Sequence, residues 1–282
     1  MIRTGLVIIS VVFFVLFFSC KPDHQKRAEA DFLKVEQFAR NSQPKSAIRL
    51  LDSMQVQYAS DYGVVGKVLK MKSIIGNRFY QEMIEAANST MEVLDREIAT
   101  LEGNFRYTPG EAGRPGVYEH RRQSPQNSWN RTYLKINLND KGDVWLSSHY
   151  YGKEWIDHTS IRVYDRDLYV LSDTIPLGDV WNRKVEDLGD RWEIIEFREG
   201  TDAGIMAFIA DHYERPLKAR FNGRKFHYIV METFDREAIH YGWRLAQLLK
   251  ERESLRQTID LYQRELIKVG PLSEGVDSVN SN

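Results

Sequence analysis

Cysteine is nearly absent from this chain, since Cys20 is the only one among 282 residues. A surplus of charge of either sign is also lacking, because 39 lysines and arginines stand against 40 aspartates and glutamates, for a net charge of −1. That balance excludes a general nucleic-acid binder, which carries a basic excess to displace counterions. With 42% hydrophobic and 28% charged residues, the composition is that of an ordinary folded protein.

Recognisable catalytic signatures are missing as well. The sequence contains no G-x-S-x-G, G-x-x-x-x-G-K-[ST], H-E-x-x-H or G-x-G-x-x-G motif. One E-x-x-H occurs, from Glu237 to His240, whereas carboxylate-bridged di-iron bundles use two such motifs and further glutamates. We therefore expect no metal and no other cofactor, and the sequence favours a protein that is not an enzyme.

The N-terminus holds the one long apolar run, residues 5–18, which follows Arg3. The run is shorter than the roughly 20 residues of a membrane-spanning helix and suits the apolar region of a signal peptide. Ser19 then precedes Cys20. This arrangement resembles the bacterial lipoprotein signal, and its Phe-rich lipobox looks like those of Bacteroidota, although Phe17 stands where the pattern usually has leucine.

The resemblance implies a signal peptide over residues 1–19, a diacylglycerol on Cys20 and a lipidated tether over residues 20–28. An acylated Cys20 leaves no thiol for a disulfide or for cysteine catalysis. Lys21 follows the cysteine where aspartate would stand, which by resemblance to the proteobacterial sorting rule permits the outer membrane. Because residues 21–27 lack the acidic run of Bacteroidota surface export, we expect the periplasmic leaflet rather than the cell surface. The alternatives are an uncleaved anchor helix and a plain signal peptide with an incidental cysteine.

Two heptad stripes flank the middle of the chain. Residues 29–101 read as helical; they include 43–54, which resembles the second helix of a tetratricopeptide-like hairpin, and end in a stripe from Tyr80 to Leu101. Residues 233–268 carry a matching stripe, broken only at Arg252. A heptad stripe buries its apolar side only against a partner. We predict that the two helices pair antiparallel as a stalk; separate packing on a sheet and a homo-oligomeric coiled coil are the alternatives.

Between the stripes the sequence predicts a β domain. Residues 102–128 are rich in glycine and proline and are expected to be a loop. Residues 129–232 read as about eight short strands, among them 203–210, with a type I′ turn at Asn222-Gly223. The predicted class is α+β: an N-terminal helical hairpin and two long heptad helices flanking an antiparallel β sandwich or partly open barrel. Residues 269–282 are expected to form a disordered tail.

Aromatic residues give the candidate binding site. Tryptophan and tyrosine in alternating strands usually belong to the core, which is where we expect Trp145 and Trp192. Tyr150, Tyr151 and Trp155 lie at a predicted strand end, where exposed rings can stack on sugars or anchor a protein partner. This trio is the candidate ligand-binding site.

The sequence therefore favours a membrane-anchored envelope lipoprotein whose β domain is a non-catalytic binding or assembly module. Its expected partners are the membrane, through the lipid, and an envelope protein or a glycan. One alternative is an envelope hydrolase or metal-dependent enzyme with a site near His149 and His158, where zinc could polarise a water. The other is a structural spacer that forms homo-oligomers through its helices. In style the mature chain resembles Bacteroidota lipoproteins, but it carries the motif of no functional family.

Overall fold

The computed structural model describes residues 22–270, so Cys20, the expected signal peptide and most of the expected tail lie outside the described residues. The α+β prediction is confirmed: this part of the chain has six α-helices and two antiparallel sheets, and neither sheet closes into a barrel. It forms two compact units, the first from the described parts of Met1–Ser89 and Gln257–Asn282, the second from Thr90–Arg256. Two long helices, α4 (Tyr62–Glu102) and α7 (Thr233–Val269), contribute to both units.

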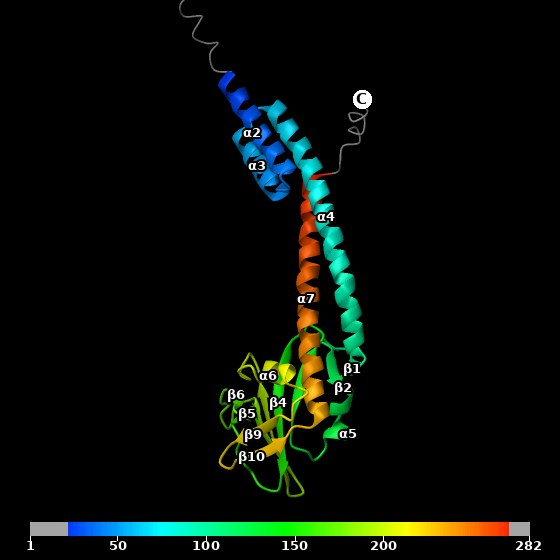
Figure 1. Cartoon of the computed structure of the whole chain (residues 1–282), viewed down its shortest axis with the longest axis vertical. Coiled ribbons are helices and arrows are strands. Elements are labelled where there is room, and N and C mark those ends of the chain that lie inside the picture. Colours follow the sequence, from blue (N-terminus) through cyan, green and yellow to red (C-terminus); the bar gives the residue numbers. More distant parts are fainter. Residues whose placement is uncertain (1–21, 271–282) are drawn as a thin grey trace, which may run out of the picture. The chain divides into compact units, whose positions relative to one another are not determined.

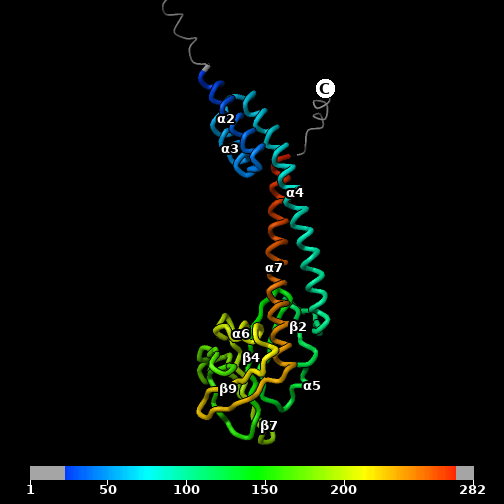
Figure 2. Tube along the Cα trace, viewed as in Figure 1, coloured from blue at the N-terminus to red at the C-terminus, as the bar shows by residue number. Residues whose placement is uncertain are grey.

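In the first unit α2 (Pro22–Arg40), α3 (Pro44–Gln57) and the start of α4 lie side by side (Figures 1 and 2). Proline suits the start of α3, because the first helical N–H has no partner within the helix. The three helices share one apolar cluster, which includes Phe32, Val35, Leu51, Met54, Tyr58 and Val68. The predicted N-terminal helical hairpin is therefore present and packs against a third helix.

The two long helices pair antiparallel inside each unit. In the first unit the rings of Tyr80 and Tyr262 lie 6.1 Å apart, and Asn77 Nδ2 donates to the carbonyl of Gly270 at 2.7 Å. In the second unit residues of both stripes share one buried cluster, which includes Leu94, Ile98, Leu245, Leu248 and Leu249. Arg252, the polar break in the second stripe, lies 3.6 Å from Asp95 of α4. Each stripe thus buries its apolar side against the other.

The second unit contains both sheets. The larger has the order β1 (Phe105–Thr108), β2 (Val117–His120), β3 (Tyr133–Asn139), β4 (Val144–Gly152), β8 (Asp190–Phe197), β7 (Asn182–Asp187). The smaller has the order β10 (His227–Val230), β9 (Lys218–Asn222), β5 (Ser160–Asp165), β6 (Leu168–Leu171). All pairings are antiparallel, as the alternating sequence predicts.

The six-stranded sheet has one face in the core, which we call the inner face. Part of this face packs with the smaller sheet and a short helix, α6 (Ile205–Asp211), in a cluster that includes Leu146, Ile195, Ile161, Phe221 and Ile209. The rest packs against α7 and α4, through Phe105, Tyr118 and Leu138 among others. The start of α7 crosses this sheet (Figure 1). The opposite, outer face is therefore the one that is left for other contacts.

Residues 22–28, expected to belong to the lipidated tether, form the start of α2, and Ala28 is buried in the cluster of the first unit. Two further segments also differ from the sequence-based expectation. The apolar run 203–210, expected to be a strand, contains α6, where burial of Ile205, Met206, Ile209 and Ala210 follows helical spacing. Asp202 accepts a hydrogen bond from the N–H of Met206, which stabilises this helix start. The expected loop 102–128 contains the β1–β2 hairpin, a single turn of 3-10 helix (η1, Arg121–Gln123) and a short helix (α5, Pro125–Ser128). Both misreadings concern runs too short for periodicity to separate helix, strand and loop.

The turn between β3 and β4 presses against α7, and this contact gives a testable prediction. Gly142 has φ +79°, and a Cβ there would lie 2.9 Å from the carbonyl oxygen of Ala246. Gly178 has a similar φ of +86°, but nothing lies within 4 Å of its Cβ position. Gly178→Ala should cost about 1–2 kcal/mol from the left-handed backbone alone, and Gly142→Ala should cost clearly more because the backbone of α7 must also move. Urea unfolding of both variants measures the difference, and equal losses would contradict a tight turn–helix contact.

Candidate functional site

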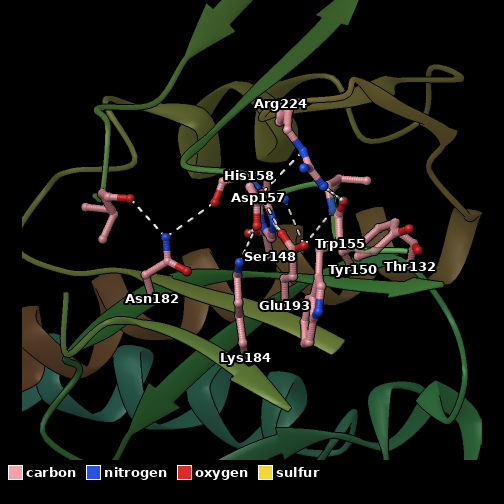
Figure 3. Close-up of polar contacts among 12 residues, drawn as sticks. Thr132, Ser148, Tyr150, Trp155, Asp157, His158, Asn182, Lys184, Glu193 and Arg224 are labelled. Carbon is pink, nitrogen blue, oxygen red and sulfur yellow. Dashed lines mark hydrogen bonds and ion pairs between the residues drawn. The ribbon is translucent and has the colours of Figure 1, made fainter. Parts of the chain in front are cut away.

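Three polar side chains from separate segments meet in the core of the second unit (Figure 3). Ser148 lies on the inner face of β4, Glu193 lies on the inner face of the neighbouring strand β8, and His158 comes just before β5. Ser148 Oγ is 2.9 Å from His158 Nε2, and His158 Nδ1 is 2.8 Å from Glu193 Oε2. All three residues are fully buried.

The Glu193 carboxylate accepts four hydrogen bonds. Oε1 accepts from the N–H groups of Ile156 at 2.7 Å and Asp157 at 2.9 Å. Oε2 accepts from the N–H of His158 at 2.9 Å as well as from its ring. Three successive backbone donors thus turn toward one carboxylate, and Asp157 adopts a positive φ of 56° between them. The carboxylate therefore fixes the loop between β4 and β5 in a conformation that its sequence would not favour alone.

These hydrogen bonds also set the charge state of the carboxylate. Burial raises the pKa of Glu193, but the hydrogen bonds from the His158 ring and from the loop N–H groups outweigh burial, so that the pKa is lowered from its ordinary value. Glu193 is therefore a carboxylate at neutral pH, with both oxygens occupied by donors.

A serine, a histidine and a carboxylate in this order form the hydrogen-bond chain of nucleophilic hydrolases. Here the chain is enclosed: Ser148, His158 and Glu193 have no exposed surface, and the His158 ring packs against Phe221 with centroids 5.2 Å apart. A nucleophile must reach its substrate, and this hydroxyl faces only the core. The arrangement holds the β4–β5 loop onto the six-stranded sheet.

The two histidines of the predicted alternative site are not brought together. His158 faces the core, whereas His149 lies on the outer face, where Nε2 is 3.0 Å from Ser147 Oγ and the ring stacks on Tyr133 at 4.7 Å. Burial, followed by the charges of Lys135 and others, lowers the pKa of His149 to about 3, so that it is uncharged at neutral pH. Across residues 22–270, no three histidine, cysteine or acidic side chains are grouped so that they could hold a metal ion.

The predicted aromatic trio is divided among three places. Tyr150 is buried on the inner face, where its hydroxyl donates to the carbonyl of Glu154 at 3.0 Å. Tyr151 points to the outer face, with its ring 5.4 Å from that of Trp192. Trp155 lies in the β4–β5 loop, with Lys184 Nζ 5.0 Å from its ring centre. Of the trio, only Tyr151 therefore belongs to the outer face.

The outer face is rich in aromatic and nitrogen-bearing side chains. Its central members alternate with core residues along β3, β4 and β8; they are Tyr133, Lys135, Trp145, His149, Tyr151 and Trp192. Trp145 and Trp192, which the alternation assigned to the core, are thus on the opposite side. A period of two specifies that alternate residues share a face, but it does not say which face is covered.

One end of the outer face is hollowed. A cavity of about 210 Å³, which we call the aromatic cavity, lies between the 123–131 segment and strands β3, β4 and β8. Its lining includes Gln123, Trp129, Arg131, Tyr133, His149 and Trp192. Trp129 is 71% exposed, and its ring centroid lies 6.1 Å from that of Trp192. Nothing in the local sequence marked Trp129 or Gln123 as site residues, because both sit in the segment expected to be a loop or at its end.

A second aromatic group, the Trp181 cluster, lies elsewhere on the outer face and consists of Trp145, Trp181 and Arg198. The Arg198 guanidinium lies 3.6 Å from the ring centre of Trp145 and 4.5 Å from that of Trp181. Glu196 orients this guanidinium through contacts of 2.9 and 2.6 Å. Trp181 remains 40% exposed, so the cluster presents an aromatic and cationic surface that is already held in place.

Comparison of the chain with protein-family models, curated proteins and solved structures finds no match. None of the helices described is long and apolar enough to cross a membrane. The roles assigned to residues here therefore rest on the geometry and chemistry of the chain itself.

The enclosed carboxylate gives a second prediction. Glu193→Gln replaces one oxygen by an amide group that must face two N–H donors, which leaves buried donors unpaired and should cost about 3 kcal/mol or more. Ser148→Ala removes a single hydrogen bond and should cost about 1–2 kcal/mol. Denaturant unfolding measures both changes. Equal small losses would contradict the assigned role of the carboxylate.

The same variant tests the lowered pKa of Glu193. A carboxylate with a lowered folded-state pKa contributes stability above its ordinary pKa of 4.5, and this stability is lost as the pH falls through the folded-state value. The unfolding free energy of the wild type should therefore fall more steeply below about pH 4.5 than that of Glu193→Gln. Parallel pH profiles would show that the carboxylate carries no such linkage.

Proposed function

We propose that this protein is a lipid-anchored, non-catalytic binding module of a bacterial envelope, and that the outer face of the six-stranded sheet is its binding surface. The observation that carries the proposal is the contrast between the two faces of this sheet. On the inner side the hydrogen-bonded residues Ser148, His158 and Glu193 are inaccessible to a ligand. The outer face presents exposed tryptophans and one positioned cation, Arg198. Aromatic and arginine side chains of this kind dominate the energetics of recognition surfaces.

The arrangement of the long helices supports a binding module over a spacer that associates through its helices. In the second unit Leu94 and Ile98 of α4 pack with Leu245 and Leu248 of α7, and in the first unit the Tyr80 ring lies 6.1 Å from the ring of Tyr262. A stripe that is already buried against its own chain has no large apolar surface left for a second copy. The β unit carries the exposed tryptophans Trp129 and Trp181.

The envelope location of the proposal rests on the sequence alone. The apolar run 5–18 and Cys20 resemble a lipoprotein signal, and a lipid anchor there would hold the chain at a membrane. Lys21 and the absence of an acidic run after it favour the periplasmic leaflet of the outer membrane. The partners expected at this location are another envelope protein or a glycan.

Site-specific photocross-linking tests the binding surface. A benzophenone amino acid placed at Trp181 on the outer face should give adducts with an envelope component in living cells. The control position is Tyr228, which is 56% exposed on β10 of the smaller sheet and should give none. Adducts of equal yield at both positions, or at Tyr228 alone, would count against the outer face.

Metabolic labelling tests the anchor. The wild-type chain should incorporate labelled palmitate and partition into the detergent phase, because buried acyl chains contribute about 0.8 kcal/mol for each methylene. Cys20→Ser removes the acceptor thiol and should abolish labelling. Persistent labelling and unchanged partitioning in this variant would remove the lipid attachment from the proposal.

A further inference from the structure

One buried carboxylate lies behind the lining of the aromatic cavity. Asp235 lies in the first turn of α7 and is 2% exposed. Its carboxylate accepts hydrogen bonds from both Nη atoms of Arg131, at 2.5 and 2.9 Å. Asp235 Oδ1, which accepts the 2.9 Å bond from Arg131, also accepts a hydrogen bond from Gln123 Nε2 at 2.8 Å. Gln123 and Arg131 therefore meet at a single oxygen, behind the lining to which both contribute.

Besides Ser128 Oγ, two buried polar atoms of the lining residues have no protein partner in the described chain. Gln123 Nε2 also donates to the carbonyl of Leu134 at 2.9 Å, so both acceptors lie on the nitrogen side and the amide orientation is settled. Gln123 Oε1 is buried and receives no hydrogen bond from any described residue, although Gln123 is only 1% exposed. Arg131 Nε is likewise buried and finds no acceptor in the described chain. Buried polar groups are almost always paired, so this pair of atoms calls for a partner.

The walls of the cavity are aromatic. Trp129 stands at its edge, largely exposed, and Trp192 lies behind it between Trp129 and Tyr151, with ring centroids 6.1 and 5.4 Å away. Tyr133 and His149, stacked on each other, complete the lining next to them. Exposed tryptophan next to a polar pocket is a surface on which a ring with apolar C–H groups can stack.

The charges around the cavity are already neutralised. Arg131 is paired with Asp235, and Lys135 Nζ lies 3.0 Å from Glu119 Oε1. The third basic side chain of the lining, His149, is uncharged at neutral pH. An anionic ligand would therefore find no unpaired cation in the lining, whereas an uncharged ligand needs no countercharge.

We infer that the aromatic cavity binds one ring of a neutral saccharide. A sugar hydroxyl is both donor and acceptor, so it can pair with polar side chains of the lining such as Gln123 and Arg131, while the C–H face of the ring stacks on Trp129 or Trp192. The volume of about 210 Å³ is below the roughly 300–1,000 Å³ of pockets for drug-sized ligands, which suits one ring of a longer chain. The inference rests on the proposed binding function and names the ligand class at one end of the outer face.

Fluorine NMR of the full acylated chain in detergent micelles, labelled with 5-fluorotryptophan, tests this inference. The six tryptophans give separate probes, which Trp→Phe variants assign. The titrants are maltohexaose, cellohexaose, xylohexaose and mannohexaose as neutral chains, hexagalacturonate as an acidic chain, and adenosine as a flat heteroaromatic ligand. At least one neutral chain should shift the signals of Trp129 and Trp192 and leave that of Trp181 unchanged.

Two matched substitutions sharpen the test. Trp129→Ala removes an exposed stacking surface with little risk to folding and should weaken saccharide binding by about tenfold or more. Tyr228→Ala removes an exposed aromatic ring from β10 of the smaller sheet, away from the proposed binding surface, and should leave the affinity unchanged. Equal effects of the two substitutions would overturn the assignment to the cavity.

The remaining outcomes are equally decisive. If no neutral chain moves Trp129 at millimolar concentration, or if only hexagalacturonate or adenosine does, the neutral saccharide is wrong. Should photocross-links at Trp181 still form in that case, the binding function of the outer face stands and only the ligand class falls. Loss of both results would remove the proposed function as well.

Discussion

The β unit depends on one buried carboxylate. Glu193 gathers three consecutive loop N–H groups and the His158 ring around its two oxygens, and His158 in turn reaches Ser148 on the adjacent strand. A carboxylate taken out of water is costly unless donors surround it, and here four of them do. The network therefore closes one end of the core and holds the loop that leads from the larger sheet to the smaller one.

The two faces of the six-stranded sheet differ in accessibility. On the inner side the polar residues Ser148, His158 and Glu193 are enclosed and hydrogen-bonded to one another. On the outer face Trp181 and Trp129 remain exposed, and the guanidinium of Arg198 is held between aromatic rings by Glu196. A rigid sheet whose inner side is fixed in this way can present the other side as a preorganised binding surface.

The sequence predicted those features that repeat over many residues. The heptad stripes of α4 and α7 persist for about six turns, so their helical state and their need for a partner were evident. Alternation over β3 and β4 likewise predicted antiparallel strands. The short elements were not predicted correctly, because α6 has only seven residues and β1 and β2 have four each. Runs of that length carry no clear period.

The site could not be read from the sequence, for physical reasons that concern contacts distant along the chain. Ser148 and Glu193 are 45 residues apart and meet only because β4 and β8 are neighbours in the sheet. Gly223 was expected to adopt a positive φ in a type I′ turn, but its φ is not positive. A Cβ at this position would instead lie 2.2 Å from the carbonyl oxygen of Ile156. Close approach of the β4–β5 loop, which Glu193 holds, explains this glycine.

We propose that the Ser–His–Glu chain is structural and that recognition belongs to the outer face. Treatment of the native chain with a fluorophosphonate, followed by mass spectrometry, tests it most directly, because this reagent modifies accessible activated serines. We expect no adduct on Ser148 while the chain is folded. A stoichiometric adduct on Ser148 that disappears in His158→Ala would contradict the account and identify a working nucleophile.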